Sequence, residues 1–274
     1  MVGTAIVGET AGFPGEAIAS GYGAQSNTPP PEGGTLALGR VKVATENFAK
    51  FTFPEKDQTH EMFNNTWADT TSAHQAMIMT QWTADKIEAT AAWDWPAWDK
   101  PYCHGYHAIC HGLEPASGVN TDSRFPFPIS RYGSLTLDIP NVYVVGDGKW
   151  QLAFDMFLFK DASSWSAGNV QAEIFIRVKA QNMGLPSIPV GSLTSCGVNY
   201  YCGQYAAGQT LYHFSRTDDP NVPFRQQINI YDFIRFLKEK GVARDSNILA
   251  GVYFGSEPIE GSGSWRIDSF YVTL

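Results

Sequence analysis

The chain has few basic residues and no long apolar segment. It carries 19 lysine and arginine residues against 27 aspartate and glutamate residues, which gives a formal net charge of -8. Nucleic-acid-binding proteins need a basic patch or stripe, so this composition argues against that class. No apolar run reaches the roughly 20 residues of a membrane-spanning helix, so we expect no contact with a membrane.

A secretory signal is also missing from the start of the sequence. The first ten residues, MVGTAIVGET, have no basic region, and glycines and Glu9 interrupt their apolar stretch. Two explanations stay open: a leader was removed and Met1 added, or the protein does not use that route.

Cysteine is scarce, with four residues in two close pairs, Cys103 with Cys110 and Cys196 with Cys202. Local disulfides and free buried thiols are both consistent with this spacing. The run CHGYHAICH (103–111) adds three histidines to the first pair, and such side chains can ligate zinc. Because the spacing matches no standard zinc motif, we favour a disulfide or free thiols over a metal site.

Turn-forming residues, in contrast, are abundant. The 26 glycines and 16 prolines are typical of an all-β protein with many short strands, and a domain of this kind can span the whole length. Residues 1–40 are interpreted as an extended arm, because NTPPPEGG (27–34) cannot continue a helix or a central strand. This arm is either a disordered tail or a segment that docks on another chain. Residues 41–274 are predicted to form one β domain, with strands that include 41–43, 132–137 and 142–145.

One segment, residues 228–241, has helical spacing instead. Its apolar positions are Ile230, Phe233, Ile234 and Leu237. Asn229 is the predicted N-cap, Asp232 lies in the first turn, and Gly241 is the predicted C-terminal stop. We therefore expect one amphipathic helix that packs against the outside of a sheet.

Three carboxylates, Asp155, Glu173 and Glu257, lie opposite apolar rows in alternating segments. Successive side chains of a strand face opposite sides of a sheet, which separates the rows from the carboxylates. The predicted core rows are Leu152, Phe154, Met156 and Leu158; Ile174, Ile176 and Val178; and Ala250, Val252 and Phe254. The opposite face carries Gln151, Ala153, Phe175, Arg177, Lys179, Gly251, Tyr253 and Gly255 as well as the carboxylates. Two such carboxylates are the minimum for hydrolysis of a glycosidic bond.

The chain from about Phe63 to Leu274 resembles glycoside hydrolase family 12, the small β-jelly-roll endoglucanases. The similar segments, in the family's order, are NNTW (64–67), WDW (93–95), LAFDMF (152–157), AEIFI (172–176), LPSIPVG (185–191), FIRFL (233–237) and GSEPIEGSG (255–263). No single motif is specific, but their shared order is hard to explain by chance. The resemblance implies an all-β jelly-roll sandwich of two antiparallel sheets, with a concave substrate cleft and one packing α-helix.

The same resemblance implies a retaining endo-β-1,4-glucanase that acts on cellulose-like, mixed-linkage or xyloglucan chains. Glu173 would be the nucleophile, Glu257 the acid/base, and Asp155 the group that tunes Glu173. Retention requires the two carboxyl groups to lie about 5–5.5 Å apart. This chemistry needs no metal or organic cofactor. The family also favours an extracellular location, although the missing signal leaves a particle-associated or cytoplasmic origin open.

Aromatic residues supply the candidates for sugar binding. Trp67 is the predicted sugar platform. Trp93 and Trp95 share a strand face, and either a platform or a core position is open for them. We favour the core because tryptophans in sandwiches usually pack, but Trp95 is kept as a substrate-binding candidate.

Three further candidates lie near the carboxylates. Phe175 and Arg177 stand where the family has a methionine and a tryptophan, and Tyr253 shares the face of Glu257. Arg177 and Lys179 would add positive charge beside the cleft, which suggests the hypothesis of an acidic or decorated glucan as substrate.

A non-catalytic role is the alternative. A carbohydrate-binding or structural module on the same fold, for example part of a larger particle, would fit the arm, the missing signal and Arg177. The presence of both glutamates and of Asp155 argues against it.

Overall fold

The computed structural model describes residues 40–66, 74–83, 86–97 and 103–274. The predicted arm, residues 1–40, lies outside the described residues except for Arg40. The strands are β1 (Arg40–Ala44), β2 (Lys50–Glu55), β3 (Gln58–Asn65), β4 (Gln75–Thr83), β5 (Lys86–Trp95), β6 (Tyr106–Glu114), β7 (Val119–Asn120), β8 (Phe127–Pro128), β9 (Thr136–Gly146), β10 (Lys149–Phe159), β11 (Val170–Gln181), β12 (Ile188–Ser195), β13 (Val198–Gln204), β14 (Leu211–Arg216), β15 (Phe224–Asn229), β16 (Ile248–Leu249), β17 (Gly251–Ile267) and β18 (Tyr271–Thr273). A short 3-10 helix, η1 (Ala167–Asn169), and an α-helix, α2 (Ile230–Glu239), complete the described elements.

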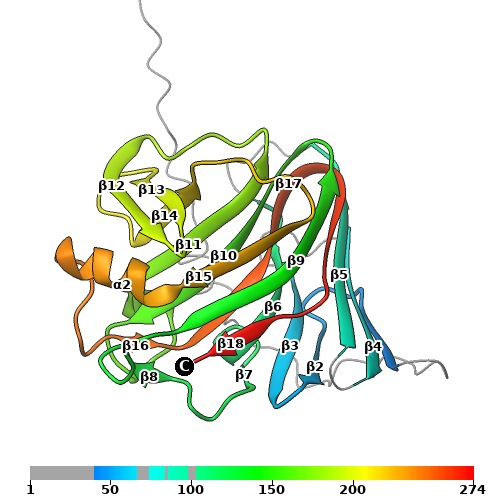
Figure 1. Ribbon diagram of the computed structural model, residues 1–274, viewed down its shortest axis with the longest axis horizontal. Coiled ribbons are helices and arrows are strands. Elements are labelled where there is room, and N and C mark those ends of the chain that lie inside the picture. Colours follow the sequence, from blue (N-terminus) through cyan, green and yellow to red (C-terminus); the bar gives the residue numbers. More distant parts are fainter. Residues whose placement is uncertain (1–39, 67–73, 84–85, 98–102) are drawn as a thin grey trace, which may run out of the picture.

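The strands form two large layers around one core. The first sheet has the order β1-β4-β5-β17-β9-β15, with β18 also on β9. The second has the order β2-β3-β6-β17-β10-β11-β14-β13-β12. The pairs are antiparallel except for β11 with β14, which is parallel. The predicted all-β jelly-roll sandwich with one packing helix is confirmed (Figure 1).

Strand β17 belongs to both layers. Its first half, from Gly251, pairs with β10 and β6 in the second sheet. Its second half, from Gly261, pairs with β5 and β9 in the first sheet. Gly261 lies at the crossing with φ of +89°, and a Cβ there would meet Asp147 and Gly148, so the close approach requires glycine.

The predicted helix is present with its predicted ends, but its apolar residues join the main core and do not pack on the outside of a sheet. Asn229 caps it, because its side-chain Oδ1 accepts a 3.1 Å hydrogen bond from the Tyr231 backbone N–H. Asp232 lies in the first turn, and Gly241 follows the helix with φ of +74°. The apolar face packs on Tyr200 of β13 and Phe214 of β14, and Phe214 faces away from Glu173 by strand parity.

One strand prediction needs correction. Residues 132–135 are not in a strand, because β9 begins at Thr136; it runs to Gly146 and includes the predicted strand at 142–145. Pro140 lies inside this strand. The predicted strand at 41–43 is present within β1. In the described part of the chain, no helix is long and apolar enough to cross a membrane.

Candidate active site

Strand β10 brings the three predicted carboxylates to one face of the second sheet. It pairs with β11 on one side and with β17 on the other. Asp155 lies opposite both Phe175 and Tyr253, which places it between the strands of Glu173 and Glu257. The apolar residues of the opposite face join the main core, as the alternation predicts: Leu152, Phe154, Met156, Leu158, Ile174, Ile176, Val178, Val252 and Phe254.

Ala250 is the exception to this pattern. It precedes the first residue of β17 and packs with Tyr253 in a second hydrophobic cluster, not in the main core. Because β16 ends at Leu249 and β17 begins at Gly251, strand alternation does not extend through Ala250.

The two glutamates lie in different rows across β10. Glu173 is opposite Phe157, and Glu257 is opposite Gln151. These rows are six residues apart along β10, which corresponds to about 20 Å in an ideal flat strand. The two carboxyl groups can therefore come close to each other only if the sheet curves toward this face. Asp155 lies between the rows, and the charges of Glu173 and Glu257 both act on it.

Burial dominates the electrostatics of the site. Glu173 is 0% exposed, Asp155 3% and Glu257 6%. Burial raises the pKa of Glu257 to about 7. Burial also raises the pKa of Asp155 well above its usual range, and the charges of Glu173 and Glu257 raise it further. A large fraction of Glu257 therefore keeps its proton near neutral pH, and both burial and the neighbouring carboxylates disfavour ionisation of Asp155.

A buried hydrogen-bond chain holds Glu257. The Nε2 of Gln151 donates a 2.7 Å bond to its Oε2, and the Cys103 thiol is a second hydrogen-bond partner. The Oε1 of Gln151 lies 3.3 Å from His213 Nε2, and His213 Nδ1 lies 3.0 Å from the Ser215 hydroxyl. Burial lowers the pKa of His213 well below its usual range, so the imidazole is neutral. A proton on Nε2 then satisfies every contact, with Ser215 donating to Nδ1.

Cys103 and His213 were not predicted as site residues from the sequence. Gln151 was placed on this face by alternation, but its partner was not known. Contacts such as Gln151 with His213 join residues far apart in the chain, and periodicity within one strand contains no signal for them.

The predicted sugar-binding residues divide into three groups. Trp67 lies outside the described residues. Phe175 is buried and stacks on His213 with ring centroids 5.0 Å apart, whereas the Tyr253 hydroxyl donates a 2.8 Å bond to the Leu113 carbonyl. Arg177 lies on the site face and donates to the Gly184 carbonyl at 2.8 Å.

Trp95 occupies the core position that the sequence analysis favoured, and its role in substrate binding stays a prediction. It is 2% exposed, lies in the main core and donates through Nε1 to Gln75 Oε1 at 3.2 Å. Its ring stacks on His104 at 4.0 Å. Its hydrogen bond and its ring stacking are both made inside the protein, in agreement with the preference for packing stated for Trp93 and Trp95.

A second pair of buried carboxyls, Glu61 and Glu114, was missed by sequence reasoning. Glu61 lies opposite Cys110 on the neighbouring strands β3 and β6, and accepts a 2.8 Å bond from the Ser117 hydroxyl. Burial and the Glu114 charge raise the pKa of Glu61 to about 8, and burial raises that of Glu114 to about 7. His60, Glu61 and Met62 are all inaccessible, so both faces of this strand are buried. The sequence therefore has no alternation of apolar and polar residues here that would predict the burial of Glu61.

The Cys/His run, residues 103–111, does not gather around one point. His107 contacts the Ser256 hydroxyl at 2.6 Å, whereas His111 contacts Asp122 at 3.0 Å. No group of three or more potential ligands that could hold a metal ion occurs among the described residues. All four cysteines are free thiols, so the disulfides kept open by the sequence are not formed.

An all-β sandwich with a face of buried carboxyls is compatible with a glycoside hydrolase, because glycoside hydrolysis uses a pair of carboxyl groups. The sequence model of Glycosyl hydrolase family 12 matches residues 58–274. The chain therefore belongs to this family and is a glycoside hydrolase with a glucan substrate. No curated protein sequence matches it significantly.

Solved structures share the fold. A family 12 xyloglucanase from Bacillus licheniformis is 21% identical with a TM-score of 0.68, and the match covers 84% of this chain and 99% of that chain. A metagenome-derived family 12 endoglucanase is 18% identical with a TM-score of 0.69, over 86% and 98% of the two chains. An endoglucanase from Rhodothermus marinus is 17% identical with a TM-score of 0.63, over 82% and 98%. At these identities the likeness establishes the fold.

Proposed function

We propose that the protein is a retaining endo-β-1,4-glucanase in which Glu173 is the nucleophile and Glu257 the acid/base. The observation that carries this proposal is the common face of Asp155, Glu173 and Glu257 on three adjacent strands. Solved relatives named as endoglucanases and a xyloglucanase support a β-glucan substrate.

In the first step, Glu173 attacks the anomeric carbon while Glu257 protonates the leaving glycosidic oxygen. A pKa of about 7 keeps Glu257 protonated at mildly acidic pH, as a general acid requires. In the second step, Glu257 takes a proton from water, and the resulting attack releases the sugar from Glu173.

Asp155 supports this division of roles. Burial and the charges of Glu173 and Glu257 raise its pKa, which favours the protonated form beside Glu173, and a protonated carboxyl can donate a hydrogen bond. Glu173 is fully buried, so binding of a polymer must rearrange side chains on this face.

The test is reducing-sugar release on barley mixed-linkage glucan, xyloglucan and carboxymethyl cellulose. Glu173→Gln and Glu257→Gln should lose nearly all activity, whereas Glu61→Gln, which changes a buried carboxyl on β3, two strands from β17, should keep it. Correctly folded wild type that cleaves none of these polymers would overturn the catalytic proposal in favour of a binding or structural module.

Stereochemistry tests the retaining step separately. Proton NMR of the first products should show the β-anomer before mutarotation. Initial release of the α-anomer would indicate an inverting enzyme, whose carboxyls lie roughly 6.5–9.5 Å apart, and would contradict a nucleophilic role for Glu173.

A further inference from the structure

Arg177 is a buried cation without an acidic partner among the described residues. Its side chain is on the face of Glu173, and the residue is 7% exposed. Its single hydrogen bond within the described chain goes from Nη1 to the Gly184 carbonyl. A guanidinium has five N–H donors, so most of its donor capacity is unused.

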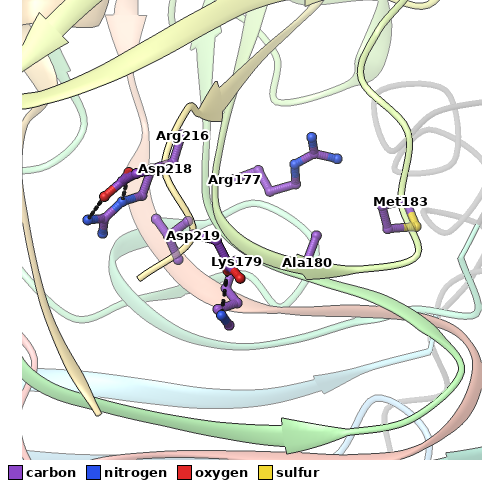
Figure 2. A pocket seen from close by; sticks show the side chains of 8 residues that line it. Arg177, Lys179, Ala180, Met183, Arg216, Asp218 and Asp219 are labelled. Carbon is purple, nitrogen blue, oxygen red and sulfur yellow. Dashed lines mark hydrogen bonds and ion pairs between the residues drawn. The ribbon is translucent and has the colours of Figure 1, made fainter. Parts of the chain in front are cut away.

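The neighbouring cations differ from Arg177 in this respect. Lys179 pairs with Asp219 at 2.5 Å, and Arg216 pairs with Asp218 at 2.5 Å. Figure 2 shows both pairs, and it shows no interaction between Arg177 and another drawn residue. The sequence analysis placed positive charge on both Arg177 and Lys179. Since Asp219 offsets the charge of Lys179, Arg177 is the one of the two whose charge is not balanced by an acidic partner.

These groups surround a pocket of about 200 Å³. It is lined by Arg177, Val178, Lys179, Ala180, Met183, Arg216, Asp218 and Asp219 (Figure 2). The planar fork of arginine matches a carboxylate better than a lysine does, since two parallel N–H groups can bind both oxygens.

The pocket adjoins the proposed catalytic face. Arg177 is four residues from Glu173 on β11, with Phe175 between them on the same face. The charges of Arg177 and Glu257 both act on the Tyr205 hydroxyl, and that of Arg177 also acts on His213. A polymer that reaches Glu257 thus passes near the guanidinium.

Burial of an unpaired charge is costly, and a bound anion would offset that cost. Because the chain has a net charge of -8, the attraction for an anion must come from a local site and not from the whole surface. We propose that the Arg177 pocket binds a carboxylate of the substrate, so that the enzyme prefers a β-glucan that carries acidic substituents. This inference rests on the proposed function of the adjacent face.

The experiment compares two polymers with one backbone, carboxymethyl cellulose and neutral hydroxyethyl cellulose. Arg177→Gln should lower kcat/KM on the acidic polymer by about 10-fold to 100-fold relative to the neutral one. Lys238→Gln is the control, because Lys238 is also paired with an aspartate, Asp245, but does not line this pocket; it should leave the ratio unchanged. Arg177→Lys should restore part of the preference, since it keeps the charge and loses the fork.

The outcomes separate this inference from the proposed function. If wild type and Arg177→Gln cleave both polymers with the same ratio, the acidic-substrate inference is wrong and the glucanase proposal stands. If wild type cleaves neither polymer, affinity electrophoresis in gels with each polymer gives the answer without catalysis. Retardation by carboxymethyl cellulose that Arg177→Gln abolishes would support the anion pocket, and its absence in wild type would overturn it. Equal melting temperatures of wild type and variant would show that the changes are not due to unfolding.

Discussion

Gln151 and Glu257 face each other across adjacent strands, and the Gln151 amide donates a 2.7 Å hydrogen bond to the Glu257 carboxyl. This bond favours the ionised form and so lowers the pKa of Glu257, against the larger opposite effect of burial. Removal of the donor should therefore raise the pKa further.

We predict that Gln151→Ala moves the basic limb of the kcat/KM–pH profile to higher pH, because Glu257 then stays protonated longer. Gln171→Ala is the control, as that amide donates to the Val242 carbonyl and not to a carboxyl. The measurement is initial rate against pH on a soluble β-glucan. A basic limb that stays in place would show that Glu257 is not the group that sets it.

The thiols should differ sharply in reactivity. Cys196 is exposed, whereas Cys103, Cys110 and Cys202 are buried, and burial raises the pKa of each buried thiol. A thiol reagent should therefore modify one thiol per native chain and four per denatured chain. Cys196→Ser should abolish the native reaction. Rapid modification of a second thiol in native protein would contradict the burial of Cys103, Cys110 and Cys202.

Stability should decline as pH rises through the neutral range. The folded pKa of Glu61, about 8, lies above the ordinary glutamate value of 4.5, so the folded protein binds more protons than the unfolded chain between these values. The free energy of unfolding is then highest below about pH 4.5 for this group and falls as pH rises toward 8, by up to about 1.4 kcal/mol per pH unit.

Glu61→Gln should reduce this decline, because the neutral amide never ionises. The melting temperature of the variant should fall less between pH 5 and pH 8, relative to wild type, than that of Glu239→Gln, whose side chain is exposed at the helix end. A variant with the same pH dependence as wild type would mean that Glu61 does not remain protonated in the folded state.

The N-cap of α2 offers a local test of stability. Asn229→Ala removes the acceptor for the Tyr231 N–H and should lower the free energy of unfolding by about 1 kcal/mol. Asn229→Asp keeps an acceptor at this position and should restore most of the loss. Chemical denaturation of both variants provides the measurement, and equal destabilisation by the two would argue against a capping role.

Strand alternation and helix capping were readable from the sequence because each depends on neighbours within a few residues. They correctly assigned the core rows of β10 and β11 and the ends of α2. Alternation failed at Ala250, where the strand is interrupted, and at residues 132–135, which precede β9.

The carboxyl environment could be predicted only in part. The common face of Asp155, Glu173 and Glu257 follows from parity together with the family resemblance. The partners of these groups do not, because Cys103, Gln151 and His213 come from three distant segments whose contacts depend on strand order and register. The pairing of Lys179 with Asp219, which leaves Arg177 as the free cation of the described pocket, was invisible for the same reason.

Strand β17 makes the two layers mechanically dependent on each other. Glu257 is four residues before Gly261, where the strand passes from the second sheet into the first. Separation of the layers would pull directly on the backbone that carries Glu257, so the proposed acid/base cannot keep its place once the sandwich begins to open. Heat should therefore abolish catalysis and the near-UV signal of the packed tryptophans at one temperature, with no inactive but folded intermediate.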